Sequence, residues 1–257
     1  MIHRHVPVRA VWIVVLVAGW EATRALLNAS PLVMPGVPSI LASFADAWVH
    51  GELPAQLALS LGLVAVGMSI ATVLALLMAL GATHSPLLAS LFDTLTSLFH
   101  PLPGIALLPV LILWFGTGVV SVLAIIVHSV VWPLLTNLRA GYVSMPPVYL
   151  LVGRNLGLQG MGLFFRVTIP ASVPFILSGM RIAWARAWRA LISAEMVFGA
   201  IAGSGGIGWF LYSRRVFMNT SGLFAGILVV MIVGVLVEDL LFGYLESRTV
   251  ARWGSGK

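Results

Sequence analysis

The chain has 257 residues, of which 60% are hydrophobic and only 9% are charged, and its formal net charge is +6. A soluble domain carries about 25% charged residues, so this composition predicts an integral membrane protein. The absence of cysteine excludes disulfides, iron–sulfur clusters and thiol chemistry. The basic residues are spread along the chain, and we therefore interpret them as determinants of membrane topology and not as a nucleic-acid surface.

The first apolar segment follows Arg4 and Arg9 and predicts a membrane span at about residues 8–27. A cleaved signal peptide is the alternative, but the apolar run is long and Asn28-Ala29-Ser30 is a weak cleavage site. The basic residues before this span predict that the N-terminus lies inside the cell. Glu21 and Arg24 lie three residues apart on one helical face near the far end. We interpret them as an interfacial ion pair, with a role in transport as the alternative.

Residues 30–56 contain four prolines, two acidic residues and no lysine or arginine, a composition that predicts a loop outside the cell. Within this loop, Ile40, Phe44 and Trp48 recur at helical spacing and indicate a surface helix. An uncharged span at about residues 57–82 then returns to the cytoplasmic side.

The next predicted span, at about residues 87–116, contains the interruption His100-Pro101-Leu102-Pro103-Gly104. Two prolines and a glycine cannot continue a regular helical ladder, so we expect one span that is broken in its middle. Broken helices at membrane depth are tolerated where they line a cavity or are buried in protein. His100 is therefore a candidate for the translocation pathway, and a structural histidine at the kink is the alternative.

A fourth span is predicted at about residues 119–139, with Arg139 at its inner end. His128 lies within it, and a core hydrogen bond is the preferred interpretation over a ligand role. The segment 146–172 is then the longest interruption of the apolar sequence. In it, Pro147 suits the first turn of a helix and Gly157 the left-handed cap after it.

The predicted helix of about ten residues rises about 15 Å, which is too short to cross a hydrocarbon core of about 30 Å. A second short segment, from Met161 to Val167, is expected to end at Pro170. Arg154 and Arg166 mark the loop as cytoplasmic. Two short helices on the positive side of a membrane domain indicate a docking surface.

The fifth span, at about residues 173–199, carries the charged residues Arg181, Arg186, Arg189 and Glu195. At 100° per residue Glu195 does not share a face with Arg186, so a charged partner would come from another helix or subunit. We expect Arg181 to extend toward the inner surface. Structural pairing and pathway lining stay open for Arg186 and Arg189, two deep arginines that would attract an anion.

Residues 200–220 form a glycine-rich outer loop in which Gly203, Gly205 and Gly208 make a G-x-G-x-x-G pattern. Nucleotide binding requires a strand before this pattern, and here a membrane span precedes it. We interpret the loop as the outer mouth, where a binding protein would dock. The last span is predicted at about residues 223–242, where Glu238 and Asp239 are expected to be interfacial or paired with arginine, and the C-terminus is predicted inside.

The segment around Gly157 resembles the cytoplasmic loop of ATP-binding-cassette (ABC) importer permeases, which reads E-A-A, three residues, G, nine residues, I-x-L-P. Gly157 and Pro170 keep this spacing, and Leu151-Val152-Gly153 stand where the family has Glu-Ala-Ala. The resemblance covers roughly residues 57–241 and is closest to the nitrate, sulfonate and taurine branch. The flanking matches are Leu107-Leu108-Pro109, Leu113-Trp114-Phe115-Gly116, Ser178-Gly179-Met180-Arg181 and Ala194-Glu195.

The resemblance implies an all-α, six-span type I importer transmembrane domain, formed by residues 1–257 as a single domain in the bacterial inner membrane. It implies two ATPase subunits that bind ATP and magnesium, a second permease copy, which we expect to be identical, and an extracytoplasmic solute-binding protein. The residues implied to couple to the ATPase are Leu151, Val152, Gly153, Arg154, Leu156, Gly157 and Pro170. The pathway candidates are His100, Arg186, Arg189 and Glu195.

Other classes of function fit the sequence less well. An ion-coupled secondary transporter, the main alternative, would show internal repeats and intramembrane carboxylates, and only Glu195 lies deep in a predicted span. The six histidines have no paired metal-ligand spacing. A membrane serine hydrolase would need a base near Ser204, yet no histidine follows His128. No Walker motif occurs, so we predict no cofactor and no ATP hydrolysis in this chain.

Overall fold

The computed structural model describes residues 6–200 and 205–249, and all regular structure in these two stretches is helical. Arg4, Gly203, Ser204, Arg252 and Lys257 lie outside the described residues. The helices before the short cytoplasmic segment are α1 (Val6–Leu26), α2 (Val37–Val49), α3 (Leu53–His84), α4 (Pro86–Phe99), η2 (Gly104–Leu107), α5 (Leu108–Phe115) and α6 (Val119–Val143). Those that follow are α7 (Pro147–Asn155), α8 (Gly160–Leu163), η3 (Phe164–Thr168), α9 (Ile169–Ala171), α10 (Val173–Phe198), α11 (Ile207–Val216), α12 (Thr220–Leu236), η4 (Val237–Phe242) and α13 (Gly243–Thr249).

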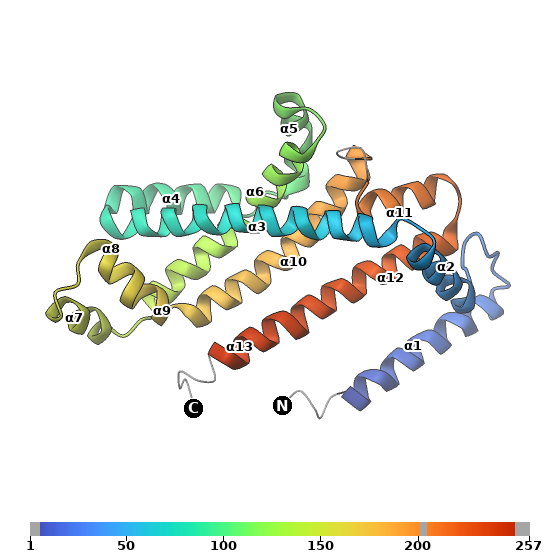
Figure 1. The fold of residues 1–257 in the computed structure, drawn as a ribbon, viewed down its shortest axis with the longest axis horizontal. Helices are drawn as coiled ribbons and strands as arrows, with labels where there is room; N and C mark the ends of the chain where they lie inside the picture. The colour runs from blue at the N-terminus through green and yellow to red at the C-terminus, as the bar shows by residue number, and fades with distance from the viewer. Residues whose placement is uncertain (1–5, 201–204, 250–257) are drawn as a thin grey trace.

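The core of the molecule is the bundle of α3, α6 and α10, with α6 in contact with both of the others along its length (Figure 1). Close approach depends on small residues, as is common between membrane helices. A Cβ atom at Gly67 of α3 would lie 2.5 Å from Cγ2 of Ile126 in α6. One at Gly179 of α10 would lie 2.8 Å from Cβ of Asn137 in α6. These glycines therefore allow the backbones of the three helices to pack closely.

Three stretches in the described part of the chain are long and apolar enough to cross a membrane alone, namely α3, α6 and the continuous run Thr220–Thr249. Two bent pairs add up to two more: α4 with η2–α5, and α8–α9 with α10. These helices give at most five spans and do not include α1, so the six-span arrangement stays a prediction. The bounds of the other long helices lie within four residues of the predicted segments, but the run Thr220–Thr249 extends seven residues beyond the predicted end at residue 242.

The predicted break after Phe99 is confirmed, because the axes of the helices on either side of it are bent by 90°. α4 lies beside α3, and α5 projects away from the bundle (Figure 1). The backbone leaves the helical ladder at the Pro101–Pro103 segment and resumes in a 3₁₀ turn at Gly104. The break therefore leaves a non-helical segment beside α6.

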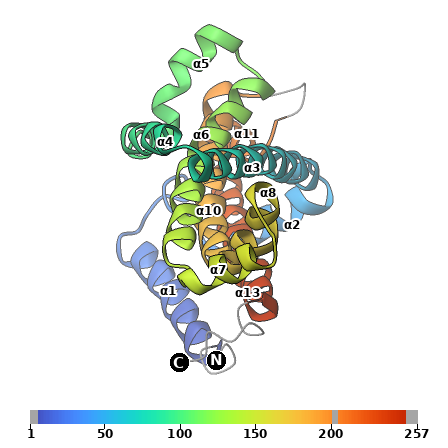
Figure 2. The ribbon, with the colours of Figure 1, turned by 90° about the vertical axis from the view of Figure 1, so that its left-hand side faces the viewer.

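Different short helices lie at the two ends of the longest axis of the molecule. The short helices α7, α8 and α9 lie together at one end, and α2 and α11 lie at the other (Figure 1). Seen from the first end, α7 and α8 lie in front of the core helices (Figure 2). The surface helix expected in residues 30–56 is confirmed as α2.

Two local expectations were wrong. Pro170 does not end the second short helix, because a π-helical turn at Phe164–Thr168 changes the hydrogen-bond register before it and the helix continues to Ala171. Residues 200–220 are not only a loop, because they contain α11. A serine and two arginines interrupt the apolar residues of α11, so its sequence does not indicate a membrane helix. Its first turn is instead held by residues of other helices.

Candidate functional site

A cavity of about 540 Å³ opens between the break after α4 and the facing sides of α6 and α10. It brings together three of the residues that the sequence indicated for the pathway: His100, Arg186 and Arg189. The other polar residues that line it are His128 and Ser129 of α6 and Ser193 of α10. None of the described residues that line it is acidic.

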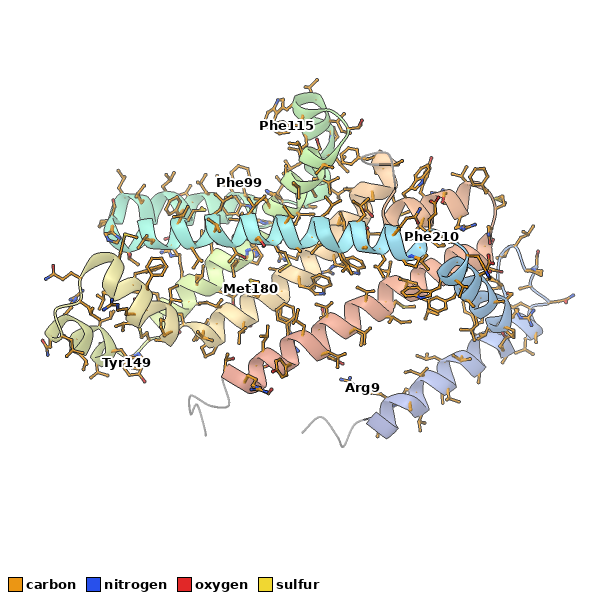
Figure 3. The ribbon with its side chains drawn as sticks, viewed as in Figure 1. Arg9, Phe99, Phe115, Tyr149, Met180 and Phe210 are labelled. Carbon is orange, nitrogen blue, oxygen red and sulfur yellow. The ribbon has the colours of Figure 1, made fainter. Side chains whose placement is uncertain are left out.

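The non-helical segment of the break is attached to α6 by His128. Its Nε2 lies 3.2 Å from the carbonyl oxygen of Leu102, and its Nδ1 lies 3.3 Å from Nε1 of Trp132. An indole nitrogen can only donate, so Nδ1 of His128 accepts from Trp132. The ring proton is therefore on Nε2, which donates to the carbonyl oxygen of Leu102. The expectation of a core hydrogen bond at His128 is therefore confirmed. Phe99, labelled in Figure 3, stacks on Trp132 with 5.5 Å between ring centroids, and both residues line the cavity.

Gly104 brings the end of the break against α6. A Cβ atom at this position would lie 2.5 Å from Oγ of Ser129. A larger residue would push the break away from α6 and change the shape of the cavity. Together with the bond from His128, this close contact attaches the non-helical segment to α6 at two points.

Arg186 and Arg189 lie one turn apart on α10 and supply the positive charge of the cavity. Within the described residues, no carboxylate lies within 4.0 Å of either guanidinium group. Arg189 donates from Nε to the carbonyl oxygen of Ala185 on its own helix, at 2.8 Å, so its terminal nitrogens stay available. Since guanidinium groups pair well with planar or tetrahedral oxyanions, the arrangement suits a small anion.

Glu195, the fourth pathway candidate, is outside this cavity and fully buried. Its carboxylate accepts a hydrogen bond from the Ser60 hydroxyl of α3, with Oγ at 2.8 and 2.9 Å from its two oxygens. It also accepts one from the backbone N–H of Gly208, at 2.8 Å. The Ser60 hydroxyl in turn accepts from the N–H of Ile207, at 2.9 Å. Among the residues that the structure describes, the partners of Glu195 are thus a hydroxyl group and a helix N-terminus, and none is a charged side chain.

This network caps α11 from outside its own sequence. The residue before α11 is Gly206, which has no side chain to cap the first N–H groups. A Cβ atom at Gly206 would lie 2.0 Å from Oε1 of Glu195, so only glycine lets the carboxylate reach the helix. Sequence reasoning missed Ser60 altogether, since it is 135 residues away from Glu195 and belongs to no motif.

At the other end of the molecule, α7 has the form that the sequence predicts. Gly157 has φ +80°, the left-handed conformation expected for it. The N–H of Leu158 bonds to the carbonyl of Gly153 at 3.0 Å, and that of Gly157 bonds to the carbonyl of Arg154 at 2.9 Å. These two bonds form a Schellman motif, which ends the nine-residue helix.

The residues of α7 divide into an outer and an inner side. Leu151, Val152 and Leu156 are 57%, 51% and 75% exposed, and Arg154 and Tyr149 are also exposed (Figure 3). Gly153 is buried instead, because a Cβ atom there would lie 2.6 Å from Cδ1 of Leu163. Gly153 therefore packs α7 against α8, and Pro170 lies half-buried at the start of α9.

Charged side chains near the ends of the long helices form ion pairs. Asp239 pairs with Arg9 at 2.7 Å, as expected for a pairing with arginine. Glu21 and Arg24 form the predicted pair at 2.9 Å. Arg139 pairs with Asp93 of α4. Arg181 donates to the carbonyl oxygen of Glu238 at 3.0 Å and lies 3.8 Å from Glu246 of α13. The last contact places Arg181 toward the C-terminal end of the run Thr220–Thr249.

The family model for "binding-protein-dependent transport system inner membrane component" matches residues 71–251, which is more than half of the chain. The chain belongs to this family. It is 28% identical to the taurine transport system permease protein TauC of Escherichia coli (strain K12), over 87% of this chain and 82% of that protein. It is also 28% identical to the putative aliphatic sulfonates transport permease protein SsuC of Bacillus subtilis (strain 168), over 93% and 84%.

A third relative, the nitrate import permease protein NrtB of Synechocystis sp. (strain ATCC 27184 / PCC 6803 / Kazusa), is 30% identical over 83% of this chain and 76% of that protein. The resemblance to importer permeases of the nitrate, sulfonate and taurine branch is therefore confirmed. As a member of the binding-protein-dependent transport family, the chain is a multi-pass inner-membrane permease component and not an enzyme. Family membership favours this function over the ion-coupled secondary transporter.

Proposed function

We propose that this permease forms the membrane pathway of an ATP-driven importer for a small oxyanion, of the kind represented by taurine, aliphatic sulfonates and nitrate in the names of its relatives. The observation that carries the choice of solute is the cavity at the break. It offers two arginines without a carboxylate neighbour in the described structure and no acidic lining residue. Charges at membrane depth commonly mark the route of a polar solute.

The proposed assembly contains two permease chains, two ATPase subunits and an extracytoplasmic solute-binding protein. The ATPase contact is α7, since three apolar side chains are exposed on a helix that is too short to cross the membrane. Both termini lie in the cytoplasm with α7, and α2 and α11 face outward. ATP binding moves α7 together with the ATPase, and α10, which follows α7–α9 along the chain, changes the access to the cavity.

The cavity is tested by removing its charge. In the reconstituted complex, R186Q and R189Q together should lower the uptake of the transported oxyanion at least about tenfold, because each substitution removes a charge-assisted hydrogen bond that contributes roughly 1.5–3 kcal/mol. Uptake of labelled taurine, an alkanesulfonate and nitrate into proteoliposomes is the measurement, with each solute supplied on its binding protein.

The matched control is R248Q, which removes an exposed arginine of α13 that does not line the cavity. It should transport at the wild-type rate. ATPase content per complex should be the same in all three proteins. A double variant with intact uptake would show that the solute does not pass Arg186 and Arg189.

A further inference from the structure

α10 joins three regions of the molecule. Its N-terminal end follows the α7–α9 segment directly, and its middle carries Arg186 and Arg189 in the cavity. Near its other end it carries Glu195, six residues or about 9 Å of helix rise beyond Arg189. A structure bound by Glu195 is therefore connected to the cavity through less than two turns of α10.

Glu195 holds the start of α11. The first two N–H groups of α11 are bound by Ser60 of α3 and by Glu195 of α10. The junction is tightly packed, because a Cβ atom at Gly208 would lie 2.5 Å from the carbonyl oxygen of Ile192 and 2.6 Å from Cβ of Glu195. A carboxylate at a helix N-terminus is also stabilised by the helix dipole. Three helices thus meet in one fully buried polar contact.

We propose that Glu195 is a positioning residue, which joins α11 to α10 and α3 as one body and carries the effect of a binding protein docked at the outer end to the arginines of the cavity. This inference rests on the proposed function, in which α11 belongs to the outer face. Glu195 itself does not touch the solute. It fixes the orientation of α10 relative to the surface that the binding protein contacts, so docking and cavity geometry change together.

The test is ATP hydrolysis by the complete reconstituted complex, measured as the concentration of solute-loaded binding protein is raised. In E195A, the maximal stimulation should fall roughly tenfold, the effect of losing one charge-assisted hydrogen bond. The concentration that gives half-maximal stimulation should stay as in the wild type, because the docking surface is intact. Hydrolysis without binding protein should also be unchanged.

Further variants separate positioning from folding. E195Q keeps the shape of the side chain and, through Oε1, an acceptor for the N–H of Gly208, so it should restore most of the stimulation. S60A should lower the maximal stimulation of ATP hydrolysis by a smaller factor, roughly threefold. If E195A does not assemble, S60A provides the test of the proposal. The matched controls are E246A and S69A, which remove an exposed carboxylate of α13 and a hydroxyl of α3 that bonds only within its own helix.

Several results would overturn the inference. One is unchanged maximal stimulation in both E195A and S60A. Another is a raised half-maximal concentration with an unchanged maximum, which would mean that Glu195 only shapes the docking surface. A third is failure of both variants to assemble while E246A and S69A assemble, which would mean a purely structural role. If the wild-type complex shows neither stimulation nor uptake, the proposed function itself fails, and the inference fails with it.

Discussion

Gly67 shows how strongly single residues constrain the core of this permease. Added methyl groups in a well-packed interface force side chains or backbone to shift, and the neighbour here is Ile126, a β-branched residue of α6. The same helix offers a comparison in Gly62, where a Cβ atom would have no neighbour within 4 Å. Both glycines lie within the helix α3, so they differ in their packing and not in their backbone conformation.

G67A should therefore destabilise the permease by about 1–3 kcal/mol, and G62A should be neutral or slightly stabilising, because alanine is the better helix former. Thermal unfolding of the purified chain in detergent, followed by the loss of the monodisperse fraction, measures the difference. Equal midpoints for G67A and the wild type would show that α3 and α6 are less closely packed than described.

At the same scale, the charge of Glu195 was evident from the sequence and its partners were not. A glutamate deep in an apolar segment demands donors, and charged residues are the donors that stand out in such a sequence. The donors found are a serine hydroxyl and a backbone N–H, which occur everywhere in the chain and give no local signal. By contrast, Arg186 and Arg189 were correctly placed together because they share one helix face.

Among the elements, α7 is the one whose geometry follows most directly from its sequence. Pro147 lies at its start and Gly157 after its end, and both positions have a backbone reason. The bounds of the long helices were predictable in a similar way, because proline, glycine or the end of an apolar segment marks them. The π-helical turn before Pro170 and the helix α11 were not predictable, because tertiary contacts determine both.

G157V should uncouple ATP hydrolysis from transport or release the ATPase, while the membrane core stays folded. Valine strains the left-handed conformation at a cost of roughly 1 kcal/mol or more, and this strain changes the end of α7 next to the exposed Leu156. Subunit ratio and solute-stimulated hydrolysis of the purified complex are the measurements. G157N is the control, because asparagine tolerates the left-handed conformation and should keep coupling; wild-type coupling in G157V would place the ATPase contact elsewhere.

For the whole molecule, the arrangement of α7 and α11 at opposite ends of the long axis predicts a single orientation in the membrane (Figure 1). The distribution of arginine and lysine predicts that the α7 end is cytoplasmic. The sequence indicated this polarity, but it did not indicate the 90° bend between α4 and η2–α5, because the direction of a broken helix depends on what the break packs against.

Since the chain has no cysteine, single introduced cysteines report this orientation without background. Q159C, next to α7, should resist an impermeant maleimide in intact cells and react after the membrane is opened. R215C, exposed on α11, should react from outside in intact cells. The reverse pattern would contradict the proposed topology and, with it, the assignment of α7 to the ATPase side.

The isolation of α1 has a consequence for how the chain is made. Its middle is exposed, from Val11 to Leu16, and its contacts are at its two ends. Arg9 meets Asp239, and Trp20 packs on Phe224 with 5.2 Å between ring centroids. When α1 leaves the ribosome, roughly two hundred further residues have to be synthesised before these two partners follow. Until then α1 is held mainly by the nearby start of α2, where Trp20 donates to the carbonyl oxygen of Pro35 and Glu21 accepts from the N–H of Val37. An apolar surface on every side of its middle turns would let it wait in the bilayer during this delay.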